Sequence, residues 1–400
     1  MKMVRKILLC VAKSLATIVL LLLLAICATS VSPIYRFAEP TPFAGDDIFN
    51  PYASFDARQG WKRANLHTHT KVEGLLNECD YTPAETESML KSFGYDIVTF
   101  SNHNELTEHP TDKALQVNLY EHGYNLFKFH KLVFGADKVL RFDHLLPILT
   151  SQKQFQLDLL GAESDFIVLN HPLRTHTMSK SAMQRLTGYQ IVELDSGRST
   201  ENEYWDEALS AGQYSFAVAN DDLHYPDRSH CIARRCNFLQ TPSARYEDLR
   251  ECLLGGCYYS MRIPDYGRGD WNIKHERNRN LPYIKNIGLQ DGDIFISLSE
   301  PADSVKVTGA HHATLAIGYN TDTLGYTMKG NDPYARFTAY FHDGEVIWSN
   351  PFARYDAEQS ASPLAVREHE VDTTYTILFN LMLLALCGAI VALLYRLFKR

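Results

Sequence analysis

The 400-residue chain has no excess of basic residues, and this absence argues against a general role in nucleic-acid binding. It carries 39 Lys and Arg against 47 Asp and Glu, a formal net charge of −8. Seven of the bases and none of the acids lie in residues 1–32 and 375–400, so the stretch between holds 32 bases against 47 acids, a net −15. Because proteins grip phosphate backbones with clusters of Lys and Arg, no specific nucleic-acid partner is expected.

The chain also lacks an Asn-x-Ser/Thr acceptor, so a glycosylated surface protein gains no support. Cysteine is scarce, and four of the eight cysteines form two C-x4-C pairs, Cys231 with Cys236 and Cys252 with Cys257. These pairs lie among apolar, strand-like residues, and an exported domain meets an oxidising compartment. We therefore expect disulfides or buried thiols there rather than a zinc knuckle.

Long apolar runs are absent from the middle of the chain and occur only at its ends. One covers residues 15–31 after four bases, and the other covers 376–395 before three bases. A helix of about 20 apolar residues crosses the roughly 30 Å of a bilayer core. The first run predicts a signal-anchor or signal peptide over 1–32, and the second a transmembrane helix over 375–396. Because flanking bases stay inside, we expect cytoplasmic termini and an extracytoplasmic domain at a membrane such as the bacterial inner membrane.

Between these ends, apolar strand-like runs repeatedly close on metal-ligand residue types. The residues at the ends of five such runs are His67 and His69, His103, His171, Glu193, and lastly Asp221, Asp222 and His224. Helical patterns, such as residues 83–93, separate the runs, which is typical of parallel β/α folds. Such folds gather the carboxyl ends of their strands on one rim, where chemistry occurs.

The spacing within two of these runs favours a shared metal centre. Side chains two residues apart on a strand point the same way, so His67 pairs with His69 and Asp222 with His224. Neutral imidazole and carboxylate suit Zn, Mn or Fe, and several such ligands together suit two or three ions. The sequence therefore predicts a cluster of divalent metal ions on the rim.

Four motifs resemble those of the PHP (polymerase and histidinol phosphatase) superfamily, in order and over roughly residues 60–262. They are NLHTHT at 65–70, TFSNHN at 99–104, NHP at 170–172 and NDDLH at 220–224. The resemblance implies a distorted (β/α)7 barrel and two or three metal ions that activate water, most often for phosphoester hydrolysis. It also implies metal ligation by His67, His69, His103, His171, Asp222 and His224.

Three departures from the superfamily pattern leave some ligands open. An aspartate usually follows His-x-His closely; here Glu78 or Asp80 takes that place, with Glu73 a further candidate. Asn102 stands where the second motif often has Asp. The bridging glutamate between the second and third motifs is not evident, and Asp143, His144 or Thr150 stands in its region. Our expected metal set therefore adds Glu78, Asp143 and Glu193, and an incomplete cluster is an open alternative.

After the barrel, assigned to 33–270, alternating apolar patterns predict a small antiparallel β-sandwich over 271–356 and a linker over 357–374. Residues 350–356 resemble the end of the carbaryl-hydrolase-like branch of the superfamily. The expected function is a membrane-tethered, metal-dependent hydrolase of small phosphoesters or esters. Arg174 would hold a phosphate or carboxylate, and His224 or Asp221 would relay protons. A catalytically impaired binding or scaffold protein is the alternative, and a nuclease is opposed by the net charge of −15.

Overall fold

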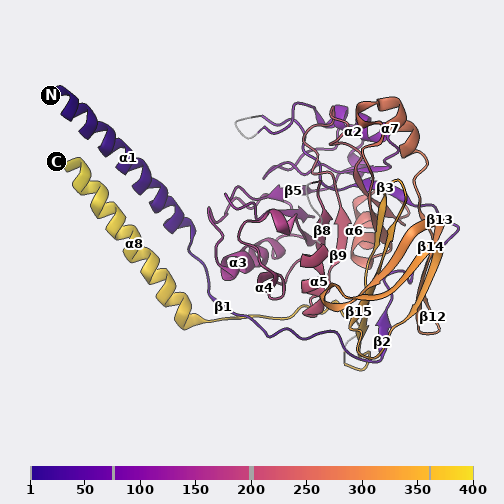
Figure 1. The fold of residues 1–400 in the computed structure, drawn as a ribbon. Helices are drawn as coiled ribbons and strands as arrows, with labels where there is room; N and C mark the ends of the chain where they lie inside the picture. Colours follow the sequence, from indigo (N-terminus) through magenta and orange to yellow (C-terminus); the bar gives the residue numbers. More distant parts are fainter. Residues whose placement is uncertain (1, 74–76, 198–201, 360–361, 400) are drawn as a thin grey trace.

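The computed structural model describes residues 2–73, 77–197, 202–359 and 362–399. Two long helices at the ends of the chain lie apart from a mixed α/β body (Figure 1). The helices are α1 (Lys2–Thr29), α2 (Pro83–Ser92), α3 (Thr150–Gly161), α4 (Lys180–Met183), α5 (Asn202–Ser210), α6 (Tyr246–Gly255), α7 (Trp271–Asn278) and α8 (Thr373–Lys399).

The terminal helices α1 and α8 run side by side, with the N- and C-termini together at the end far from the body (Figure 1). Both are long and apolar enough to cross a membrane, by length and composition. A short antiparallel pair, β1 (Tyr35–Arg36) with β18 (Glu370–Val371), joins their connections to the body. The Asn380 amide group also exchanges hydrogen bonds with the backbone of Ser32, at 3.3 and 3.1 Å.

A five-stranded sheet forms one half of the body. Its order is β5 (Leu119–His122), β6 (Lys131–Phe134), β7 (Phe166–Leu169), β8 (Ile191–Asp195) and β9 (Phe216–Ala219). Every residue of these strands is buried, as expected for strands covered on both faces. The pairs β7–β8 and β8–β9 are parallel, whereas β5–β6 and β6–β7 are antiparallel.

An 11-stranded sheet forms the other half and continues into the C-terminal part of the chain. Its path runs β12 (Ile284–Gln290), β13 (Asp293–Thr308), β15 (Tyr334–Tyr340), β16 (Val346–Ser349), β11 (Tyr258–Arg262), β10 (Arg235–Leu239), β3 (Lys62–Asn65) and β4 (Ile97–Val98). Off this path lie β14 (Thr314–Thr327), β17 (Phe352–Tyr355) and β2 (Asp47–Phe49). The antiparallel strands expected late in the chain are present, and pairing of β11 with β16 joins them to the body. The division into domains stays a prediction.

The expected closed (β/α)7 barrel is not formed by the described residues. The loop at 123–130 contains no helix, so β5 and β6 pair as a hairpin instead of a parallel unit. Isolated parallel bridges, Thr68 with Leu223 and His103 with Glu121, link the two halves, and hydrogen bonds between Asn237 and the Ala219 backbone also join β10 to β9. These bridges still bring the carboxyl ends of β3, β4, β5 and β9 to one place.

Local sequence explains the helix that separates β3 from β4. Thr82 and Glu85 form a reciprocal capping box, and Pro83 occupies the first turn, where its missing N–H costs nothing. Gly94 then adopts φ +81°, a left-handed conformation that ends the helix. The helix predicted over 83–93 is confirmed.

The thiols of Cys231, Cys236, Cys252 and Cys257 are free in the described chain, as are the other four. Cys236, Cys252 and Cys257 are buried. Within the described residues, none of the four belongs to a group able to hold a metal ion. Of the two expected forms, disulfides or buried thiols, the structure therefore has free thiols, three of them buried and Cys231 half-buried.

A buried ion pair fixes α5 against the large sheet. Arg336 on β15 donates to both carboxylate oxygens of Asp206, at 2.9 and 2.7 Å, and both side chains are 1% exposed. Burial would raise the pKa of Asp206, but Arg336 outweighs it and lowers the pKa. We predict that Asp206→Asn lowers the free energy of unfolding by about 3–5 kcal/mol, because it leaves a buried guanidinium uncompensated. Urea unfolding of the detergent-solubilised chain measures this.

The matched control is Asp303→Asn, whose carboxylate is 56% exposed. Its effect should stay within about 0.5 kcal/mol. Equal losses in both variants would contradict the ion-pair explanation.

Candidate metal centre

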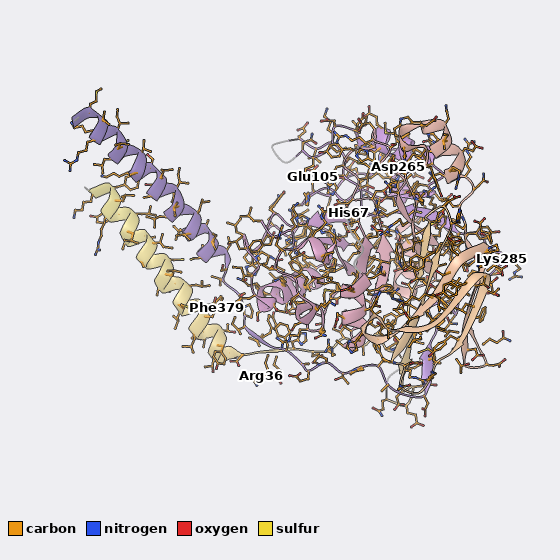
Figure 2. The ribbon with its side chains drawn as sticks, viewed as in Figure 1. Arg36, His67, Glu105, Asp265, Lys285 and Phe379 are labelled. Atoms are coloured by element: carbon orange, nitrogen blue, oxygen red, sulfur yellow. The ribbon has the colours of Figure 1, made fainter. Side chains whose placement is uncertain are left out.

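The centre begins at the end of β3, where the backbone carries two imidazoles to the same side. His69 N donates to the Leu223 carbonyl at 2.9 Å, and Leu223 N donates to the His67 carbonyl at 3.3 Å. These backbone hydrogen bonds hold the segment extended. Side chains two residues apart then face alike. Both rings are buried, and their Nε2 atoms lie 3.3 Å apart. Figure 2 shows His67 inside the body, away from Lys285 on the large sheet.

Two buried carboxylates converge on this histidine pair. Asp222 Oδ1 lies 3.1 Å from His67 Nε2 and 3.3 Å from His69 Nε2. Glu121 on β5 places Oε2 at 3.3 and 3.2 Å from the same two nitrogens, and at 3.1 Å from His103 Nε2. Four ligand atoms from His67, His69, Glu121 and Asp222 all lie within 4.8 Å of one another, which is close enough to share an ion.

Two further groups overlap the first. One joins His69 and His103 to Glu78, whose Oε2 lies 3.2 Å from His103 Nε2. The other joins His103 and Glu121 to His130, whose Nδ1 lies 3.2 Å from Glu121 Oε1. We call the seven residues of these groups the metal cluster: His67, His69, Glu78, His103, Glu121, His130 and Asp222. The three groups share His69, His103 and Glu121.

Unpartnered atoms and unusual backbone conformations support metal binding. Both ring nitrogens of His171 are buried and find no hydrogen-bond partner in the described chain, although Nε2 lies 3.4 Å from Glu121 Oε1. His103 Nδ1 is also unpartnered. His171 and Asp222 have φ of 27° and 48°, rare for residues other than glycine. Buried polar atoms normally have partners, so this donor set fits divalent ions.

Glu193 stands behind the cluster and orients it. Its Oε1 accepts from His67 Nδ1 at 2.8 Å and from Asn220 at 3.1 Å, while Oε2 accepts from the His171 backbone at 3.2 Å. Such a carboxylate fixes the ring so that the other nitrogen faces the ion. Glu193 was expected as a metal ligand, but the structure places it outside the three groups.

Electrostatics differ among the imidazoles. Burial would lower the pKa of His67, but Glu193, Glu121 and Asp222 outweigh it and hold that pKa well above the usual value. Burial would also lower the pKa of His103, but the carboxylates of Glu121 and Glu78 outweigh it and raise that pKa to about 8. At His130 burial wins and lowers the pKa to about 4. The pKa of Glu121 lies well below its usual value because His103, His67 and His130 outweigh the effect of burial.

Glu121 was not among the expected ligands, because the bridging carboxylate was expected later in the chain, near residues 143–150. Asp143 lies outside the groups that described residues form: its Oδ2 accepts from the Tyr124 backbone at 2.7 Å and from Asn125 at 3.0 Å. His144 bonds the Thr29 carbonyl instead, and Thr150 starts α3. A signal for Glu121 existed, since residues 119–122 repeat the pattern of an apolar strand closing on a ligand type.

His130 had no such signal. It precedes β6, which runs antiparallel to its neighbours, so the amino end of this strand reaches the rim. A rule that searches only carboxyl ends of strands cannot find it.

The three residues expected to be catalytic, Arg174, His224 and Asp221, have different partners near the metal cluster. Arg174 donates to Asp222 Oδ2. The His224 ring stacks on His69 with centroids 4.1 Å apart, and its Nε2 lies 3.3 Å from Glu78 Oε2. Asp221 Oδ1 instead accepts the backbone N–H groups of residues 234 and 235, at 3.0 and 2.8 Å.

A cavity of about 520 Å³ opens beside the cluster. We call it the site cavity; Glu78, Asp221, Asp222 and His224 are among the residues that line it. Cationic side chains line much of the rest, namely Lys128, Arg174, Arg228 and Arg235. This arrangement suits an anionic ligand.

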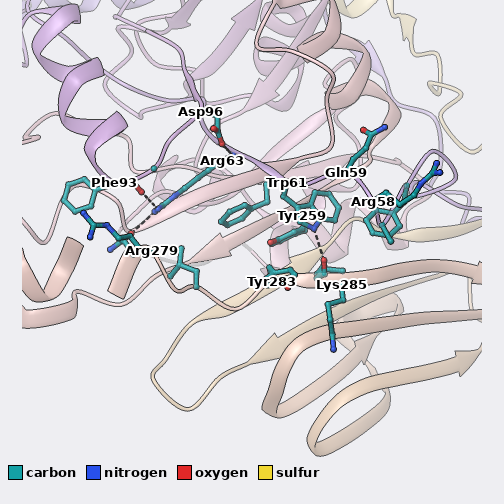
Figure 3. A pocket seen from close by; sticks show the side chains of 18 residues that line it. Arg58, Gln59, Trp61, Arg63, Phe93, Asp96, Tyr259, Arg279, Tyr283 and Lys285 are labelled. Atoms are coloured by element: carbon teal, nitrogen blue, oxygen red, sulfur yellow. Dashed lines mark hydrogen bonds between the residues drawn. The ribbon is translucent and has the colours of Figure 1, made fainter. Parts of the chain in front are cut away.

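A larger cavity of about 730 Å³ lies at the amino end of β3, away from the metal cluster (Figure 3). Aromatic residues including Trp61 and Tyr259 line it, and Arg63 in its wall donates to the carbonyl of Phe93 at 2.7 Å. No member of the metal cluster lines this cavity.

Glu121 and Asp143 make a matched pair for testing the centre. We predict that Glu121→Gln lowers divalent-metal affinity at least about tenfold, because this carboxylate belongs to two overlapping groups. Asp143→Asn should retain the wild-type content. Metal per chain after dialysis, measured by mass spectrometry, decides between the two positions; the reverse order would return the bridging role to Asp143.

No family model and no curated protein matches the chain. Among solved structures, it is similar to a two-domain protein containing a predicted PHP-like metal-dependent phosphoesterase from Bacteroides vulgatus, with 14% identity, a TM-score of 0.38, and coverage of 79% of this chain and 99% of that one. It is also similar to a lesion-specific endonuclease from Pyrococcus furiosus, with 13% identity, a TM-score of 0.34, and coverage of 49% and 56%. The geometry of the metal cluster is therefore the basis for the function proposed below.

Proposed function

We propose that the chain is a membrane-tethered, metal-dependent hydrolase of the phosphoesterase kind. One observation carries this proposal: a buried carboxylate, Glu121, lies within 3.1 to 3.3 Å of three imidazole nitrogens at the junction of two sheets. Imidazole and carboxylate donors in this number suit Zn, Mn or Fe. Two or three ions fit the overlapping groups.

The residues divide into those that would hold ions and those that would handle substrate. His67, His69, Glu121 and Asp222 would hold one ion, and His103 with Glu78 or His130 would hold a neighbour. Divalent ions at these positions lower the pKa of bound water towards neutrality and polarise a phosphoryl oxygen. His171, whose ring nitrogens find no hydrogen-bond partner in the described chain, would complete the ligand set.

Arg174 and the other cavity cations would bind and orient the anionic substrate beside the ions. A guanidinium can donate two parallel hydrogen bonds to a phosphate, and Arg174 already touches the cluster through Asp222. His224 and Asp221 both line the site cavity. His224 is the better candidate to pass a proton to the leaving group, because an imidazole is the most common general acid or base in enzymes. Asp221 uses one oxygen on backbone amides and would serve mainly to fix the turn after it.

The two terminal helices support the membrane tether. They are side by side, and their outer ends lie together (Figure 1), so both termini would emerge on one side of a bilayer. Bases flank both apolar segments and would stay cytoplasmic. We propose an extracytoplasmic body at the bacterial inner membrane.

Glu121 removes the main reason for the alternative function. A catalytically impaired binding or scaffold protein was suggested by the missing bridging carboxylate, and Glu121 supplies a carboxylate in that place. A nuclease remains opposed by the net charge of −15 between the terminal segments.

Hydrolysis of p-nitrophenyl phosphate and bis-p-nitrophenyl phosphate by the full chain in detergent tests the proposal. We expect EDTA to abolish activity and Mn²⁺ or Zn²⁺ to restore it. His69→Ala should lower kcat/KM at least about 100-fold, because this residue belongs to two ion positions. His342→Ala, at a side chain 92% exposed, should change nothing. Metal-independent activity, or full activity in His69→Ala, would end the proposal.

Arg174→Ala separates substrate binding from metal binding. We predict a fall in kcat/KM of about 10- to 100-fold, the effect of losing one hydrogen bond to a charged group, with metal content unchanged. Arg174→Lys should recover part of the loss. Arg58→Ala, whose guanidinium pairs only with Asp56 in the described chain, is the control. A loss of metal in Arg174→Ala would instead show that this residue holds the cluster together.

A further inference from the structure

Two loops beside the site cavity each combine an exposed leucine with a cation that faces the cavity. In the loop 123–130, Leu126 is 64% exposed and Lys128 lines the cavity. After β7, Leu173 is 47% exposed, and the next residue, Arg174, lines the cavity. Both loops therefore present apolar side chains to the outside and positive charge to the inside.

A third loop, residues 143–149, links this rim to the body-side end of α1. His144 bonds the Thr29 carbonyl, and Leu145 N donates to Thr29 Oγ1 at 3.3 Å. The Leu145 carbonyl of this loop accepts a hydrogen bond from Leu126 N at 3.1 Å. It also carries Ile148, which is 57% exposed. The three loops and the end of α1 thus form one hydrogen-bonded unit.

This unit also reaches the metal cluster. The hydroxyl of Tyr124, in the first loop, lies 3.5 Å from the His103 carbonyl, and the two rings are 6.4 Å apart. Hydrogen bonds therefore connect the cluster, through Tyr124 and the loop 143–149, to the end of α1. If α1 spans the bilayer, Thr29 marks the level of the lipid headgroups.

Segments that bind at a membrane surface combine exposed aliphatic side chains with Lys and Arg. The apolar groups enter the boundary of the acyl chains, and the cations meet anionic headgroups. The site cavity, at about 520 Å³, has the size of a pocket for a small ligand. It suits a phosphate headgroup and leaves no room for the two acyl chains of a lipid.

Building on the proposed function, we infer that the substrate is a phosphoester of a membrane lipid. The phosphate enters the site cavity to meet Arg174 and Lys128, while the acyl chains stay among Leu126, Ile148 and Leu173. Water adds its oxygen to phosphorus, the P–O bond to the leaving alcohol breaks, and that alcohol takes the proton. No other reactant is required.

The test compares hydrolysis of the same phospholipid headgroup in a bilayer and free in solution. The full metal-loaded chain is used in phosphatidylcholine nanodiscs. The bilayer probes are long-chain phosphatidic acid and phosphatidylglycerol; the soluble probes are their dihexanoyl analogues below the micelle concentration. We expect kcat/KM to be at least about tenfold higher for a bilayer probe. Products are followed by mass spectrometry.

Two variants test the role of the rim. Leu126→Asp and Ile148→Asp should each lower the bilayer-to-soluble ratio of rates at least about tenfold. Ile317→Asp, at a residue 43% exposed on β14, is the matched control and should leave the ratio within about twofold. Reading a ratio within each variant separates loss of lipid access from loss of folding.

The outcomes distinguish the two proposals. Equal rates on bilayer and soluble probes, or an unchanged ratio in both rim variants, would overturn the lipid substrate while keeping the hydrolase. No metal-dependent hydrolysis of any probe, p-nitrophenyl esters included, would overturn the proposed function and the lipid substrate with it.

Discussion

The contact of Glu121 with three histidines is the constraint on which the arrangement of the body depends. A carboxylate 1% exposed is costly to bury unless charge or hydrogen bonds compensate it. Here the compensation comes from His67 and His103, which follow β3 and β4 of the other sheet, and from His130. The same residue forms one of the two isolated bridges between the sheets. The metal cluster is therefore also the seam of the fold, and ions bound there would hold both halves together.

Hydrogen bonds carry this constraint outward from the cluster into the large sheet. Asn237 on β10 donates to Asn220 at 3.1 Å, Asn220 donates to Glu193, and Glu193 accepts from His67. Asn220 also accepts from Leu66 N at 3.0 Å, which fixes the start of the His-x-His segment. Since β10 pairs through β11 with β16, the C-terminal strands brace the site although they contribute no member of the cluster.

The sequence was informative wherever a parallel strand ends at the rim. His67, His103 and Asp222 follow such strands, and period-two alternation placed His69 beside His67. The prediction failed at the hairpin of β5 and β6, because pairing of two short strands across a loop is decided by the rest of the sheet. The sequence therefore did not predict Glu121 or His130 as ligands. It also did not predict the antiparallel hairpin, which explains why no barrel closes among the described residues. The misplaced role of Glu193 has another cause: a strand pattern shows that a carboxylate is near, but not which side of an imidazole it faces.

The paired connections at β1 and β18 set how the body can sit on its anchor. A protein hung from one helix by a loose linker can swivel and show any face to the lipid. Here two helices leave the body next to each other, and a strand ladder clamps the segments that follow them. Two connections of this kind limit how far the body can tilt relative to the paired helices. In a bilayer, such a mounting would hold the opening of the site cavity at a fixed height and tilt above the lipid surface.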